Sequence, residues 1–119
     1  MPILTIEGHG PVTVTAGTRL VNAIEDAGVD ILHRCGGHAK CTTCRVDFLD
    51  GEPDQMTQAE SDKLESKGDL GQYRLSCQSL VLEDMHVQPL MRLAGSGMDD
   101  AGPRPEDDIT PDPVWLDEV

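Results

Sequence analysis

Hydrophobic and polar residues alternate in two short segments at the start of the chain. Residues 3–6 and 12–15 are rich in β-branched side chains, and the second segment alternates valine with threonine. A period of two is typical of a half-buried β-strand. Residues 8–11, Gly-His-Gly-Pro, separate the two segments and favour a turn. The pattern therefore predicts an N-terminal β-hairpin.

A helical pattern follows over residues 18–27. Thr18 is a residue type that caps helix N-termini, and Gly28 is placed to end the helix. The apolar residues recur with the spacing of one helix face: Leu20, Ala23, Ile24 and Ala27. We expect this face to cover the sheet.

The middle of the chain predicts a second helix between short strands. Thr57 and Glu60 have the spacing of a capping box, in which each side chain binds the backbone N–H of the other. This helix, to about residue 66, has few apolar residues to bury, so we expect a surface helix that displays the acids Glu60, Asp62 and Glu65. The strand candidates are residues 45–49, 73–75, 80–82 and 85–87.

Composition and charge narrow the possible functions. The chain has 119 residues and a 12.9 kDa mass, enough for one domain. Its net charge of -13 repels nucleic acid and anionic membrane surfaces. Apolar runs are shorter than the ~20 residues that span a bilayer, and the first residues lack the pattern of a secretory signal. We expect a cytoplasmic monomer.

The C-terminal residues have a different composition. Residues 98–119 carry -7 of the -13 charge and four of the eight prolines. Such a segment cannot bury enough apolar area to offset its ordering entropy, so we expect residues 99–108 to be the most mobile part of the protein. The exception is Pro-Val-Trp-Leu at residues 113–116. This motif is either a clamp that packs on the domain, which we favour, or a docking motif for a partner.

The four cysteines have the spacing of a metal or redox site. Cys35, Cys41 and Cys44 lie in one glycine-rich segment, and Cys77 follows after 32 further residues. Three ligands in one loop and a distant fourth suit an iron-sulfur cluster. Structural zinc sites more often use two C-x2-C pairs, and only Cys41 and Cys44 form one here. Zinc is therefore the less favoured alternative.

Other residues of this segment predict roles around the sulfur atoms. Gly36 and Gly37 tolerate positive φ, so their backbone N–H groups can turn toward anionic sulfur. Such donors stabilise the more negative, reduced state of a cluster. His33 and His38 are not needed as ligands beside four cysteines, and we expect surface or hydrogen-bonding roles for them.

These motifs resemble those of the 2Fe-2S ferredoxins, and among them the adrenodoxin-like and related bacterial proteins. The resemblance rests on Cys-Gly-Gly at residues 35–37, Cys-Thr-Thr-Cys-Arg-Val at residues 41–46 and Arg-Leu-Ser-Cys-Gln at residues 74–78. Plant-type members have four residues between the first two cysteines, whereas this chain has five. The resemblance covers about residues 1–92 and leaves residues 93–119 as an acidic, proline-rich tail.

The resemblance implies an α+β fold, the ubiquitin-like β-grasp, with one helix crossing a mixed sheet and a short surface helix. It implies one 2Fe-2S cluster per chain, held by Cys35, Cys41, Cys44 and Cys77. Such a protein is a one-electron carrier rather than an enzyme. It takes electrons from a flavin-containing ferredoxin reductase and passes them to an acceptor, such as a monooxygenase or the iron-sulfur assembly system. Basic partners would dock on the acids Glu60, Asp62 and Glu65.

An alternative function belongs to a different class. A redox-sensing or regulatory module would use the state of its cluster to control how the acidic tail binds a partner. A sensor should change tail protection or partner affinity between redox states, whereas a carrier need not.

Overall fold

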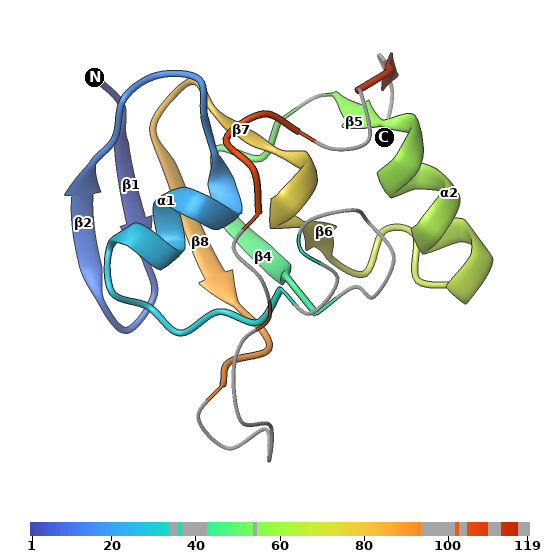
Figure 1. Cartoon of the computed structure of the whole chain (residues 1–119), viewed down its shortest axis with the longest axis horizontal. Helices are drawn as coiled ribbons and strands as arrows, with labels where there is room; N and C mark the ends of the chain where they lie inside the picture. Colours follow the sequence, from blue (N-terminus) through green and yellow to red (C-terminus); the bar gives the residue numbers. More distant parts are fainter. Residues whose placement is uncertain are drawn as a thin grey trace.

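A five-stranded mixed sheet forms the centre of the molecule (Figure 1). The computed structural model describes residues 1–33, 36, 43–53, 55–93, 102, 105–109 and 113–116. The strands in spatial order are β2 (Gly10–Thr13), β1 (Ile3–Ile6), β8 (Met85–Pro89), β4 (Arg45–Asp50) and β6 (Arg74–Leu75). Only β1 and β8 are parallel. The predicted hairpin is confirmed as β1 and β2, and the other predicted strands are present with shifted ends.

Helix α1 (Leu20–Asp26) lies across the sheet in front of β1 and β8 (Figure 1). Four of its residues supply the core beneath it: Leu20, Val21, Ala23 and Ile24. The helix ends where expected, because Gly28 adopts φ 96°, a conformation that residues with a side chain rarely adopt.

Thr18 does not cap α1, so that prediction is wrong. Thr18 and Arg19 form the short strand β3 (Thr18–Arg19), which pairs with β7 (Leu80–Val81). The Thr18 hydroxyl donates to the Thr15 carbonyl at 2.7 Å, and the N-cap position belongs to Arg19, which makes no side-chain cap. Because Thr18 and Arg19 pair with β7, a distant part of the chain, the helix begins at Leu20 and not directly after Thr18.

Helix α2 (Gln58–Lys67) begins after β5 (Met56–Thr57), at the end of the molecule opposite β2 (Figure 1). Thr57 is its N-cap, and its hydroxyl accepts from the Glu60 N–H at 3.1 Å. The other half of the predicted capping box is wrong. The Glu60 carboxylate turns into the protein, where its Oε2 accepts from the Leu75 N–H at 2.7 Å.

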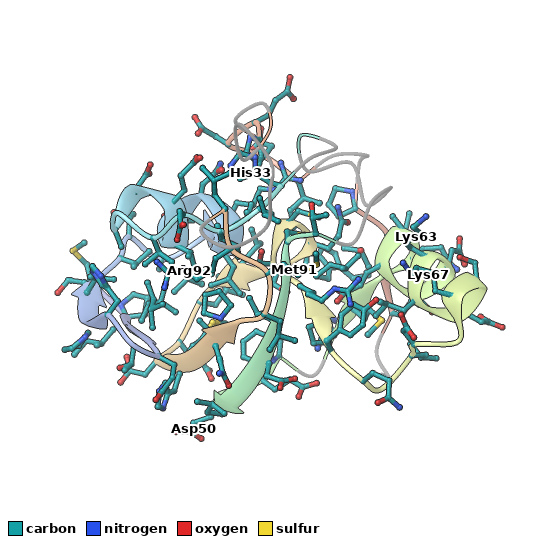
Figure 2. All side chains as sticks on the ribbon, turned by 90° about the horizontal axis from the view of Figure 1, so that it is seen from below. His33, Asp50, Lys63, Lys67, Met91 and Arg92 are labelled. Atoms are coloured by element: carbon teal, nitrogen blue, oxygen red, sulfur yellow. The ribbon has the colours of Figure 1, made fainter. Side chains whose placement is uncertain are left out.

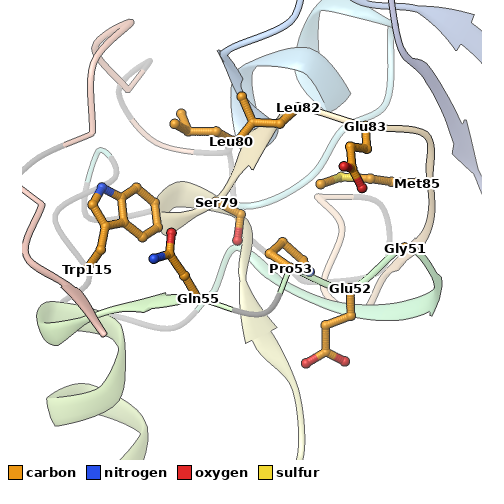
Figure 3. A pocket seen from close by; sticks show the side chains of 10 residues that line it. All are labelled: Gly51, Glu52, Pro53, Gln55, Ser79, Leu80, Leu82, Glu83, Met85 and Trp115. Atoms are coloured by element: carbon orange, nitrogen blue, oxygen red, sulfur yellow. The ribbon is translucent and has the colours of Figure 1, made fainter. Parts of the chain in front are cut away.

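The end of the tail lies against the domain. Strand β9 (Trp115–Leu116) pairs antiparallel with β5, and the Gln58 N–H donates to the Val114 carbonyl at 2.7 Å. Apolar burial accompanies this backbone pairing only in part, since Trp115 is 37% exposed and Val114 is 61% exposed. Its indole lines a pocket of about 610 Å³ together with residues of β7, β8 and the loop before β5 (Figure 3). Residues 113–116 thus pack on the domain, as expected of a clamp, and backbone hydrogen bonds to β5 and Gln58 contribute to the contact.

Residues 105–109 are also packed on the domain, which corrects part of our expectation of mobility. Pro105 is buried and Ile109 is only 5% exposed. The expectation failed because it counted side-chain area and overlooked backbone carbonyls, which here accept hydrogen bonds from α1. Residues 99–101, 103 and 104 of the predicted range lie outside the described part of the chain. No helix in the described part is long and apolar enough to cross a membrane.

Candidate metal centre

Two of the four cysteines are brought together by strand pairing. Cys44 immediately precedes β4, and Cys77 lies in the 3₁₀ turn η1 (Ser76–Gln78) that follows β6. Arg45 is the register partner of Leu75, so the two strands carry the cysteines to the same end of the pair. Ser76 links the two segments, because its N–H and its hydroxyl both donate to the Cys44 carbonyl, at 3.2 and 2.6 Å.

The two thiols are buried and contact each other. Cys44 is 2% exposed and Cys77 is 0% exposed. The hydrogen bond between the thiols, together with burial, raises the pKa of Cys44 well above its usual range. Buried thiols in this state become thiolates only beside a cation. The donor set therefore fits a thiolate-binding metal or cluster.

The remaining predicted ligands, Cys35 and Cys41, lie outside the described residues, as do Gly37 and His38. Within the described part, no three or more His, Cys, Asp or Glu side chains are arranged so that they could hold a metal ion. Gly36 is buried and has the positive φ expected of it, 72°, but its N–H is not directed toward sulfur. Its own N–H donates to the His33 carbonyl at 2.9 Å.

His33 has the hydrogen-bonding role that we expected, although it is buried rather than at the surface. Its side chain is 1% exposed, and Nε2 lies 2.7 Å from the Glu25 Oε1 of α1. Figure 2 shows His33 beside α1. The pair joins the segment that carries the first cysteine to the helix that crosses the sheet.

Sequence reasoning missed a buried ion pair beside this centre. Arg74 is 5% exposed and Glu60 is 0% exposed, and the Arg74 Nε donates to Glu60 Oε2 at 2.9 Å. Burial raises the pKa of Glu60, and Arg74 opposes that rise. Arg74 also binds the Gln55 carbonyl at 2.9 Å, so it fastens the loop before β5 to β6. The spacing of a capping box gave no sign of this partner.

Glu60 therefore cannot serve as a docking residue, which corrects the prediction. Asp62 and Glu65 are exposed on α2, as expected. The same helix carries Lys63 and Lys67, both labelled in Figure 2. The exposed surface of α2 is thus mixed in charge rather than uniformly acidic.

Comparison with known proteins identifies the family of this site. The 2Fe-2S iron-sulfur cluster binding domain family matches residues 4–82, a span that includes all four cysteines. The chain belongs to this family. The resemblance found in the sequence is confirmed, and the cofactor of the family is one 2Fe-2S cluster.

Solved ferredoxins have the same β-grasp fold. The ISC-like 2Fe-2S ferredoxin FdxB from Pseudomonas putida is 30% identical with a TM-score of 0.59, and the match covers 74% of this chain and 91% of FdxB. A ferredoxin from Rhodopseudomonas palustris is 26% identical with a TM-score of 0.57, over 76% of this chain and 99% of that one. The predicted fold class is confirmed.

Sequence relatives include larger proteins. One subunit of the Na(+)-translocating NADH-quinone reductase of Shewanella denitrificans is 37% identical over 89 residues, which are 72% of this chain and 21% of that protein. Its counterpart in Marinomonas sp. is 31% identical over 85 residues, again 21% of its length. The chain thus spans about a fifth of these curated relatives.

Proposed function

We propose that the protein is a one-electron carrier whose 2Fe-2S cluster is held by Cys35, Cys41, Cys44 and Cys77. The observation that carries the proposal is the buried contact between Cys44 and Cys77 inside the span matched by the family. Matches to FdxB and to the Rhodopseudomonas ferredoxin cover nearly all of those chains, which supports a carrier rather than an enzyme.

The chain's own groups would hold the sulfur ligands and exclude water. When bound, a 2Fe-2S cluster supplies a one-electron redox couple. Cys44 and Cys77 would provide buried thiolates, and the Gln78 side chain donates toward the Cys77 sulfur at 3.7 Å. Because all four ligands are thiolates in an acidic protein, we expect a negative reduction potential, well below that of a Rieske centre.

The electron source that fits best is a flavin-containing reductase. Related sequences occur within larger reductase proteins, and a 25% identical structure, with a TM-score of 0.59, is part of the Amycolatopsis cytochrome P450 reductase GcoB. The match covers 86% of this chain and 27% of GcoB. We propose that the reductase and a redox acceptor bind in turn, through acids that include Asp62 and Glu65. The cytoplasmic location stays a prediction.

Metal analysis of the purified chain tests the proposal. We expect iron and acid-labile sulfide in equal amounts, at one 2Fe-2S cluster per chain, and a paramagnetic signal after reduction by one electron. Cys77→Ser should lose most of the cluster because ligand loss is coupled to unfolding. A colourless chain that retains zinc would overturn the proposal, and so would a Cys77→Ser protein with an unchanged spectrum.

A further inference from the structure

Arg19 lies between the Cys77 turn and the C-terminal segment, and it contacts both. Its side chain is buried, at 1% exposure. The Nε atom donates to the Cys77 carbonyl at 2.6 Å. The Nη1 atom donates to the carbonyls of Glu106 and Asp108, at 3.0 and 3.1 Å. One guanidinium thus joins segments that are 58 or more residues away from it in the sequence.

A second side chain of the same region holds the C-terminal segment. Asn22 lies on α1 and is 2% exposed, and its Nδ2 donates to the carbonyls of Pro105 and Glu106, at 3.2 and 3.0 Å. Ile109, at 5% exposure, adds an apolar anchor. The acids of residues 106–108 are exposed, so the segment binds the domain through its backbone.

Because the Arg19 side chain is buried, it depends on the carbonyl oxygens of Glu106 and Asp108 as hydrogen-bond acceptors. A guanidinium is always charged and carries five N–H donors, and a buried charge is tolerated only when it is hydrogen-bonded. Two of the acceptors come from residues 105–109. If this segment leaves, water must replace them, and the guanidinium is no longer fixed against the Cys77 carbonyl.

The charge of Arg19 also bears on the redox state. It lies one hydrogen bond from the Cys77 backbone and is itself buried, and electrostatic interactions of buried groups are stronger than in bulk solvent. A nearby positive charge favours the more negative, reduced state. Arg19 should therefore raise the reduction potential relative to a neutral side chain at the same position.

We propose that Arg19 is a positioning residue that fastens residues 105–109 to the backbone of Cys77. The backbone carbonyls of residues 105–109 then stabilise the metal centre through Arg19. The exposed carboxylates of the same residues stay available to bind a partner. This inference rests on the proposed role of Cys77 as a cluster ligand.

Two substitutions in the full-length holoprotein separate the charge of Arg19 from its geometry. Arg19→Gln removes the charge, and Arg19→Lys keeps it but cannot reach both carbonyl sets with one ammonium group. We expect a lower reduction potential for Arg19→Gln and a potential close to the parent for Arg19→Lys. Amide hydrogen exchange in residues 105–109 should be faster in both variants.

Two truncations test the segment without touching Arg19. Ending the chain after residue 104 removes residues 105–109, whereas ending it after residue 112 removes only β9 and its neighbours. We expect loss of the cluster to a chelator to be roughly tenfold faster in the shorter chain, as for the loss of one hydrogen bond to a charged group. The longer chain should resemble the parent.

The outcomes distinguish this inference from the proposed function. If the parent protein holds no 2Fe-2S cluster, the proposed function fails and the inference fails with it. If the cluster is present but the two truncated chains lose it at equal rates, the function stands and the role of residues 105–109 is refuted. A potential of Arg19→Gln equal to that of the parent would refute the electrostatic role of Arg19.

Discussion

Glu60 is a charged side chain that stabilises the interior of the protein through buried hydrogen bonds. Its carboxylate is fully buried and accepts hydrogen bonds from the Arg74 guanidinium and the Leu75 N–H. Removing one member of a buried ion pair leaves the other charge without compensation, which costs far more than losing a surface pair. Glu60 therefore supports the approach of β6 to α2, at the strand end where Ser76 contacts Cys44.

Charge reversal at Glu60 should unfold the protein or nearly so. In Glu60→Lys a second buried cation would face Arg74, and we expect a loss of about 3 to 5 kcal/mol in the free energy of unfolding. Glu65→Lys on the exposed side of α2 is the matched control and should change it by less than about 0.5 kcal/mol. Thermal unfolding followed by circular dichroism measures both. Equal midpoints for the two variants would contradict the buried position of Glu60.

Charged residues were also where sequence reasoning failed. A capping-box spacing located Thr57 and Glu60 correctly at the start of a helix, but charged side chains are rarely fully buried, so Glu60 was expected at the surface. Its partner Arg74 is 14 residues away, and the Cys77 carbonyl that Arg19 binds is 58 residues away. Local patterns carry no information about such pairings. Cysteine spacing, by contrast, predicted one shared site for all four cysteines, and the structure brings two of them, Cys44 and Cys77, into contact.

Secondary structure elements were predicted where their signals are local. The hairpin follows from its period of two, α1 from the spacing of its apolar residues and from Gly28, and α2 from the capping-box spacing of Thr57 and Glu60. The two-stranded ribbons β3–β7 and β5–β9 could not be predicted, because each joins residues far apart in the sequence with only two residues per strand. These ribbons are the elements that displace the start of α1 and hold the end of the tail.

Thr57 connects two elements near the candidate metal centre. Its hydroxyl accepts from the Glu60 N–H at the start of α2 and donates to the Gln78 Oε1 at 2.7 Å. The Gln78 amide in turn donates toward the Cys77 sulfur. One hydroxyl thus caps a helix and orients a donor to a predicted ligand.

Thr57→Val should therefore affect both stability and redox behaviour. It keeps the shape of the side chain but loses both hydrogen bonds, so we expect a loss of about 1 to 3 kcal/mol in the free energy of unfolding. Without the fixed Gln78 donor, the reduced state should be less stabilised and the potential lower. Thr57→Ser keeps the hydroxyl and is the control. If its potential and unfolding midpoint fall as far as those of Thr57→Val, the hydroxyl has no such role.

The β9 contact predicts a small contribution from Trp115. The indole is 37% exposed, whereas Leu64 of α2 is 0% exposed. We expect Leu64→Ala to cost about 2 to 5 kcal/mol in the free energy of unfolding, and Trp115→Ala clearly less, because the backbone pairing with β5 remains. The midpoints of thermal unfolding of the two variants measure these losses in stability. A larger loss for Trp115→Ala would mean that the indole, and not the backbone, holds the tail.

At the scale of the whole molecule, net charge and local charge make different contributions to association. A charge of -13 creates a field that attracts basic partners. The helix α2 offers Asp62 and Glu65 among lysines, so it can orient a bound partner but contributes little net field. Steering should thus depend on the total charge, and orientation on the position of particular acids.

Association with a reductase should be fast at low salt and slow steeply as salt rises, because the Debye length falls from about 30 Å at 0.01 M to about 10 Å at 0.1 M. Glu65→Lys on α2 and Glu83→Lys, exposed between β7 and β8, change the net charge equally. If partners dock on α2, Glu65→Lys should lower the stopped-flow association rate more than Glu83→Lys at every salt concentration. Equal rates would leave steering by net charge intact and move the docking surface away from α2. Rates that do not respond to salt would contradict steering itself, because a screened field is the only long-range force available to bring the two proteins together.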